Sequence, residues 1–220
     1  MNDFYSEPIR SPSTTDERPD RIVAAALAEF AENGYSGSRL AAVARRAGVS
    51  KPTLLRYFAS KEEIFREVVR TTLLGRMAMV DGALAHGNNG NGPATAAEQV
   101  RAFALHYWAM AEQPGVAEVL RLAIGELPHF PELTVFYVTE TLERSVRTLE
   151  RVIQGGIARG ELHPHDARAS ARTVLATVAA HALWFAHPEI YAGVTGPDRD
   201  RAAAATIDSL IEAIAPVESR

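Results

Sequence analysis

The sequence predicts an all-α protein, and three observations support that prediction. Alanine is abundant, the prolines stand where helices are expected to end, and no stretch keeps the period-two alternation of a strand. With 220 residues and a hydrophobic content of 47%, the chain is long enough to bury a real core. We expect an N-terminal domain of three helices, joined by a fourth helix to a larger α-helical C-terminal domain.

Local end signals give the order of the helices. The first is expected to begin between Asp16 and Pro19 and to end at Asn33-Gly34, where glycine permits a positive φ. The second holds Leu40, with Ser38 as its candidate N-cap. Ser60 to Glu63 form a capping box at the start of the fourth helix. Further helices are expected at about 51–58, 60–86, 94–112, 115–126, 131–159, 166–186 and 198–215.

Three regions follow from this order. Residues 1–15 are polar, contain prolines and lack an apolar run, so we expect a disordered tail without a signal peptide. Residues 16–75 form the first predicted domain and residues 76–220 the second. The segment 87–93, rich in glycine and asparagine, is the clearest loop signal, and it falls inside the second domain.

The segment between Ser38 and Phe58 carries the clearest functional pattern. Two short helices are joined by a four-residue turn in which Gly48 permits a sharp reversal and Ser50 starts the next helix. Leu54 and Phe58 lie one turn apart and share an apolar face. The opposite face presents Lys51, Thr53, Leu55, Arg56 and Tyr57. An apolar back and a basic, hydrogen-bonding front are typical of the recognition helix of a DNA-binding helix-turn-helix.

The charge distribution agrees with that interpretation. The whole chain has a net charge of −4, yet residues 33–61 hold six lysines and arginines and no aspartate or glutamate. The rest of the chain therefore carries −10. A local basic surface on an acidic protein is typical of phosphate binding, although a chance cluster of surface arginines is the alternative.

The stretch from Arg21 to Val69 resembles the N-terminal domain of the TetR family of bacterial regulators. The matching residues are Ile22, Ala25, Ala26, Leu27, Phe30, Gly34, Tyr35, Val43, Ala44, Ala47, Gly48, Val49, Ser50, Lys51, Thr53, Leu54, Tyr57, Phe58, Ser60, Lys61 and Glu62. The resemblance implies a homodimer, a palindromic double-stranded DNA operator and a C-terminal domain that binds a small effector. It also implies that Tyr57 and Lys61 contact operator phosphates and that Lys51 and Thr53 face the major groove.

One residue departs from the family pattern. Leu55 stands where many members carry tyrosine. Leucine in this place exchanges a hydrogen bond for an apolar contact, such as one with a thymine methyl group. Helix geometry leaves open whether Arg56 meets a base or a phosphate. The candidate DNA-binding residues are Ser38, Arg39, Ser50, Lys51, Pro52, Thr53, Leu55, Arg56, Tyr57 and Lys61.

Aromatic residues recur on successive helices of the C-terminal part. Tyr137 belongs to this set. Several of its members combine an apolar ring with a polar group, which is a phenol, an imidazole or an indole N–H. Such a set suits either a solid core or an apolar pocket with a few polar groups, as a small effector needs. The candidate effector-binding residues are Phe103, Tyr107, Phe136, His181 and Trp184.

The last two predicted helices carry broad apolar stripes of small and branched residues. Two such helices paired across a two-fold axis would form a four-helix bundle, whereas the alternative is an internal core. The candidate dimer-interface residues are Val174, Val178, Phe185, Ile207, Leu210, Ile211 and Ile214.

Other classes of protein find little support. The chain has no cysteine, no apolar run of the ~18 residues that a membrane span needs, and no nucleophile elbow, phosphate loop or zinc-protease motif. His163-Pro164-His165-Asp166 suits a helix cap better than a metal site. We expect a cytoplasmic, non-enzymatic regulator, most simply a repressor, without metal or cofactor. The alternative is an all-α small-molecule-binding or enzymatic protein with an incidental helix-turn-helix.

Overall fold

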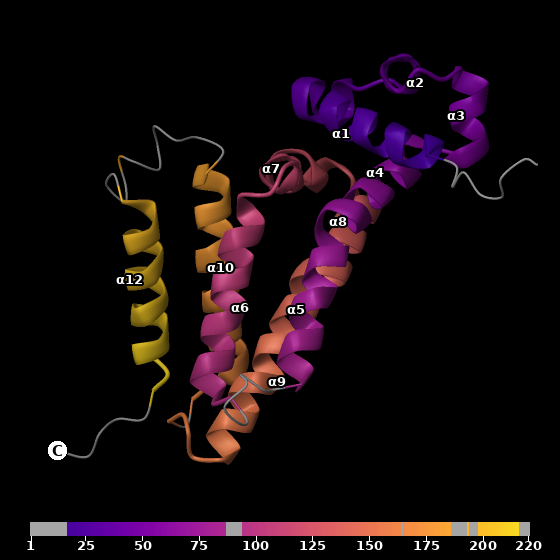
Figure 1. Ribbon diagram of the computed structural model, residues 1–220. Coiled ribbons are helices and arrows are strands. Elements are labelled where there is room, and N and C mark those ends of the chain that lie inside the picture. The colour runs from indigo at the N-terminus through magenta and orange to yellow at the C-terminus, as the bar shows by residue number, and fades with distance from the viewer. Residues whose placement is uncertain (1–16, 87–93, 164, 186–192, 194–197, 216–220) are drawn as a thin grey trace, which may run out of the picture.

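A computed structural model describes residues 17–86, 94–163, 165–185, 193 and 198–215, and every element among them is helical (Figure 1). The predicted tail and the 87–93 loop lie outside these residues. The N-terminal part consists of α1 (Arg18–Gly37), α2 (Leu40–Arg46) and α3 (Lys51–Tyr57). The fourth helix follows as α4 (Lys61–Val69), a π-helical stretch η1 (Arg70–Leu74) and α5 (Gly75–His86).

The second half begins with α6 (Ala96–Ala111), α7 (Val116–Gly125) and the short 3₁₀ helix η2 (Leu127–His129). The predicted 131–159 helix consists of α8 (Pro131–Tyr137), the π-helical stretch η3 (Val138–Glu143) and α9 (Arg144–Ala158). The chain continues through α10 (Ala167–Phe185) and α12 (Arg199–Glu212). In Figure 1, α6, α10 and α12 run side by side, while α2 and α3 project from the opposite end of the molecule.

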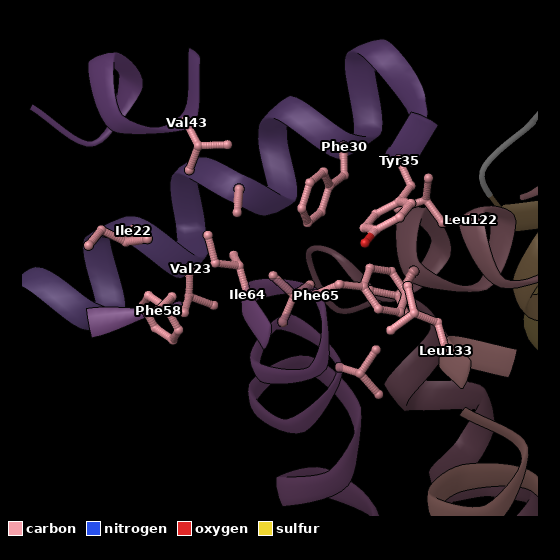
Figure 2. Close-up of a cluster of buried hydrophobic side chains, with 14 of the residues drawn as sticks. Ile22, Val23, Phe30, Tyr35, Val43, Phe58, Ile64, Phe65, Leu122 and Leu133 are labelled. Carbon is pink, nitrogen blue, oxygen red and sulfur yellow. The ribbon is translucent and has the colours of Figure 1, made fainter. Parts of the chain in front are cut away.

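Two clusters of buried side chains hold these helices together. The first contains side chains from the four helices α1, α2, α3 and α4 and from α7, η2 and α8, so it crosses the predicted domain boundary at residue 75. Phe30, Tyr35 and Phe65 stand at its centre with ring centroids 5.4 to 6.1 Å apart, and Leu122 and Leu133 close it from the second half (Figure 2). The second cluster belongs to α6, α9, α10 and α12.

The end signals are confirmed in most places. Gly34 has a φ of +70°, and Asp166 accepts a hydrogen bond from the Ala169 N–H at 2.9 Å, as an N-cap does. Ser60 caps α4 through the Glu63 N–H, while the Glu63 carboxylate returns to the Ala59 N–H, one residue before the cap.

The prediction that Ser38 caps the second helix is wrong. Arg39 stands at the N-cap of α2 and makes no side-chain cap. The Ser38 hydroxyl is buried and donates to the carbonyls of Glu29 and Gly34, so it closes the end of α1.

Four residues of the predicted dimer stripe are buried inside the protomer. Val174, Val178, Ile207 and Ile214 are each at most 4% exposed and belong to the second cluster, against which Leu210 and Ile211 also pack. For these four side chains the structure supports the internal-core alternative, because one chain already buries them. Leu210 and Ile211 are only half-buried, and their place at a dimer interface stays a prediction. The side chain of Phe185 lies outside the described atoms.

Candidate nucleic-acid interface and internal cavity

The turn between α2 and α3 is fixed by backbone geometry and by one long-range hydrogen bond. Gly48 has a φ of +67°, a conformation that L side chains rarely adopt. The Arg21 guanidinium of α1 donates to the Ala47 carbonyl at 2.6 Å and so ties the turn to the first helix. Ser50 then accepts from the Thr53 N–H at 3.1 Å and starts α3. The two short helices are thereby held at a fixed angle.

Helix α3 has a buried face and an exposed face, as predicted. Leu54 is fully buried, and Phe58, directly after the helix, is also buried. Ser50, Lys51, Pro52, Leu55 and Arg56 are exposed, and Thr53 and Tyr57 are partly exposed. Leu55, at 39% exposed, is therefore one of the few large apolar side chains that this domain presents to its surroundings.

Five of the six basic residues in the 33–61 window divide into two groups. Arg46 forms a bidentate ion pair with Glu32 and lies 3.8 Å from Glu29, both on α1. Its charge is therefore offset locally, and the pKa of Glu32 is lowered by this hydrogen bond. The other group consists of exposed cations on or beside the two short helices: Arg39, Arg45, Lys51 and Arg56.

Lys61 is engaged within the protein. Its ammonium donates to the carbonyls of Tyr35 at 2.7 Å and Ser38 at 3.2 Å, and it lies 4.4 Å from the centroid of the Tyr35 ring. The sequence offered no signal for this contact, because the partner atoms belong to the backbone at the end of α1. The role of Lys61 at an operator phosphate stays a prediction.

Tyr57 is positioned at the edge of the same surface. Its hydroxyl accepts from the Arg18 guanidinium at 3.3 Å, and the Arg56 guanidinium lies 5.5 Å from the centroid of its ring. These contacts place a phenol between two cations, an arrangement that suits an anionic partner such as a phosphate.

The first helix is held on its other side by α7 and η2. The Arg121 guanidinium donates to the Ala31 carbonyl at 2.5 Å, and the Glu126 carboxylate accepts from the Ser36 N–H at 2.8 Å. The rings of Tyr35 and Phe130 meet edge to face at 4.8 Å. The helix that carries the turn is thus bound directly to a short helix of the second half.

That short helix also forms one wall of an internal cavity of about 40 Å³. The cavity lies between η1, α5, α6, α7, α8, η3, α9 and α10. Its lining is apolar apart from hydroxyl groups, among them a hydrogen-bonded pair, Tyr107 and Ser145. Burial raises the pKa of Tyr137 to about 12, so this phenol stays neutral. The lining residues are Leu73, Met77, Tyr107, Met110, Ala111, Val116, Leu120, Tyr137, Thr141, Leu142, Ser145, Leu175, Val178 and Ala179.

The five candidate effector residues are not brought together around this cavity. Tyr107 alone among them lines it, and Phe103 stacks behind Tyr107 at a centroid distance of 4.3 Å. Phe136 packs under Arg66 and Arg70 of the fourth helix. His181 and Trp184 contact each other, and His181 also contacts the buried Trp108. Most of the lining is aliphatic and carries no sequence signal that separates it from ordinary core.

Two further expectations concern metals and membranes. No group of three or more metal-ligating side chains gathers among the residues that the structure describes. Within the same residues, no helix has both the length and the apolar character that crossing a bilayer requires.

A helix-turn-helix with an exposed basic second helix, carried on a larger helical domain, defines a DNA-binding transcriptional regulator. Residues 22–68 match the family model for bacterial regulatory proteins of the TetR family. Residues 98–214, more than half of the chain, match the model for the C-terminal domain of AefR-like transcriptional repressors. The chain belongs to the TetR family.

Individual relatives resemble parts of the chain or its fold. The regulator RutR of Escherichia coli is 48% identical over 52 residues, a match that spans 24% of either chain. A regulator of Saccharomonospora viridis, solved with choline, is 21% identical with a TM-score of 0.72, over 92% of this chain and 100% of the other. FadR of Bacillus subtilis, solved with stearoyl-CoA, is 23% identical with a TM-score of 0.67, over 88% and 95%.

Proposed function

We propose that this chain represses transcription as a homodimer on a palindromic operator, and that a small molecule in the C-terminal cavity releases it. The observation that supports this most is the exposed face of α3, where Lys51, Thr53 and Arg56 stand around Leu55 while Leu54 anchors the helix. Repression, as opposed to activation, is supported by the repressor model that matches residues 98–214.

Within this proposal, α3 lies in the major groove. Its first residues, Ser50 to Thr53, meet base edges or phosphates, Leu55 makes an apolar contact, and Tyr57 binds a phosphate beside Arg18. Arg39 adds a further exposed cation. Ser38 supports the site from behind, because its buried hydroxyl holds the end of α1.

Two helices connect the cavity with this surface. Leu73 and Met77 of the fourth helix line the cavity, and the same helix begins at Lys61, next to α3. Val116 and Leu120 of α7 line it too, and their neighbour Arg121 holds α1. A ligand that binds one arrangement of these walls better than another shifts the equilibrium between the two arrangements, and with it the orientation of α3. The size of the shift is set by the difference in affinity.

A dimer is part of the proposal because a palindrome presents its two half-sites about 34–36 Å apart, one DNA turn. A small-molecule effector is in keeping with the ligands of the two solved relatives, choline and stearoyl-CoA. The proposal assigns the chain no catalytic activity and places it in the cytoplasm, where a bacterial operator lies.

The test measures the affinity of the full chain for the DNA beside its own coding region, at two salt concentrations. We expect specific binding that weakens with salt, and a salt slope that falls by about 0.9 for each phosphate contact removed. Lys51→Ala and Arg56→Ala should lower the affinity, whereas Arg201→Ala, an exposed arginine of α12, should leave it unchanged. Light scattering on the same sample gives the oligomeric state. Equal weak binding to all sequences, or a monomer that binds a palindrome tightly, contradicts the proposal.

A further inference from the structure

A second hollow, open to solvent, adjoins the internal cavity. This groove of about 390 Å³ lies between α7, the end of α8, η3, α9 and α10. Five residues line both spaces: Leu120, Tyr137, Leu142, Leu175 and Ala179. Groove and cavity therefore adjoin along these five side chains, and we call the two spaces together the passage; they extend from the surface to the side chains of Leu73 and Met77 on the fourth helix.

The passage changes character along its length. The groove is lined by apolar side chains and by two charged ones, Glu143 and Arg172. The inner cavity is lined by no charged side chain. An ion moved into it would lose its hydration without gaining a partner, which strongly disfavours a charged group there. The inner part consequently suits an uncharged, apolar portion of a ligand, and any charged group must stay in the groove.

The ion pairs around the groove decide which sign of charge it accepts. The Glu143 carboxylate already accepts hydrogen bonds from Arg168 at 2.8 and 2.9 Å, which hold the pKa of Glu143 below its ordinary value. Arg168 also binds Glu150 at 2.9 Å. Arg172, one helical turn after Arg168, is exposed, and its charge also lowers the pKa of Glu143, although none of the ion pairs found among the described residues includes it. Because Glu143 is already bound by Arg168, the further charge that Arg172 brings to the groove is positive.

The size of the inner cavity limits the shape of the ligand. Its volume of about 40 Å³ is room for only a few water molecules, which admits the end of a thin chain and excludes fused rings. Arg172 and Ala179 are separated by about 10 Å along α10, given the helical rise of 1.5 Å per residue. A ligand that spans the passage must accordingly be elongated.

We infer that the effector is an elongated amphiphile with one carboxylate, whose head pairs with Arg172 in the groove and whose alkyl chain extends into the inner cavity. A carboxylate matches the planar guanidinium in a bidentate pair. The chain end reaches Leu73 and Met77, where it contacts the helix that begins beside α3. The role of this ligand in release from DNA rests on the proposed function, whereas its binding is a property of the second domain and requires no DNA.

The experiment is calorimetric titration of the full chain without DNA, using straight-chain carboxylates of six to twelve carbons below their micelle concentrations. Each added methylene should raise the affinity about fourfold until the chain fills the passage. Decanoate should bind about tenfold more tightly than decanol, which lacks the charge, and than decyltrimethylammonium, which reverses it. Equal affinity for all three head groups, or no increase with chain length, would overturn the inference.

Two variants test the two ends of the passage. Arg172→Gln should remove the preference for decanoate over decanol and keep the affinity for decanol, while Arg201→Gln on α12 should change neither. Ala179 lies at the junction of groove and cavity. In the Ala179→Leu variant, the increase in affinity with each added methylene should stop at shorter carboxylates than in the unsubstituted protein. Ala102→Leu on the exposed face of α6 is its control.

The outcomes separate the two proposals. Carboxylates that bind as described without changing operator affinity contradict the proposed release and leave the ligand class intact. A protein that binds its operator but favours decyltrimethylammonium contradicts the ligand class alone. An Arg172→Gln variant that keeps its full preference for decanoate overturns the placement of the head group.

Discussion

Replacement of Lys61 by methionine separates stabilisation of the fold from contact with DNA. The ammonium donates to the carbonyls of Tyr35 and Ser38 and lies over the Tyr35 ring. A hydrogen bond from a charged donor contributes about 1.5–3 kcal/mol, and a cation–π contact about 0.5–1 kcal/mol. Because Lys61 is partly exposed and one hydrogen bond is long, we take the lower values and expect a loss of about 2–3 kcal/mol.

For a chain of this size, that loss corresponds to a fall in Tm of about 4–12 °C. If the ammonium stays on the two carbonyls when DNA binds, the salt slope of operator binding should remain that of the original chain. Lys51→Met is the matched control, because Lys51 is exposed at the start of α3. It should keep the Tm and, if Lys51 binds a phosphate, reduce the salt slope by about 0.9.

The measurements are thermal unfolding by circular dichroism and fluorescence anisotropy of a labelled operator over a range of salt. A Lys61→Met protein with an unchanged Tm and a salt slope lowered by about 0.9 would refute the structural reasoning. That result would assign the ammonium to a phosphate, as the family resemblance implies.

Three further predictions concern the turn, the link between the two halves and the response to pH. Gly48→Ala should lower the Tm and weaken operator binding. A Cβ at a φ of +67° is strained by about 1–2 kcal/mol, and it would lie 2.9 Å from the Arg21 guanidinium. Calorimetry measures the Tm, and fluorescence anisotropy measures operator binding. Glu126→Gln should reduce the change in operator affinity that an effector causes, because the weakened bond to the Ser36 N–H loosens α7 from α1, and unaltered coupling in a titration with both ligands would exclude this route. Burial lowers the pKa of His106, so the unfolded chain takes up a proton more readily than the folded one. The free energy of unfolding should therefore be highest above pH 6.5 and decline as the pH falls through the pKa of His106 in the folded protein. His106→Asn should flatten this dependence of the free energy of unfolding on pH, measured by chemical denaturation between pH 7 and 5.

The sequence predicted the local structure of the helix-turn-helix well because its signals are local. A glycine with positive φ, a serine cap and an apolar pair one turn apart act over a few residues, so they can be read directly. Leu54 and Phe58 are buried and the opposite face of α3 is exposed, as that pattern indicates. The contacts that fix this unit on the protein, such as Arg21 with the Ala47 carbonyl, involve backbone atoms and carry no residue pattern.

The C-terminal half shows where such reasoning fails. An apolar stripe reports that a helix face is buried, yet it does not say whether the covering surface belongs to the same chain. Val174, Val178 and Ile207 pack into the second cluster of their own protomer, which the stripe alone did not reveal. Aromatic residues likewise marked buried positions, while the cavity lies among mostly aliphatic and hydroxyl side chains from eight elements.

By itself, then, the sequence determined the all-α class, the helix-turn-helix and its exposed basic face, because helix periodicity, caps and charge depend on neighbours within a few residues. Only the tertiary structure decided that Lys61 and Ser38 bind the end of α1, that α7 holds α1, and that the groove with Arg172 adjoins the cavity. Each of these depends on which distant helices pack together. The free energy of that packing is spread over many weak apolar contacts that no short motif records.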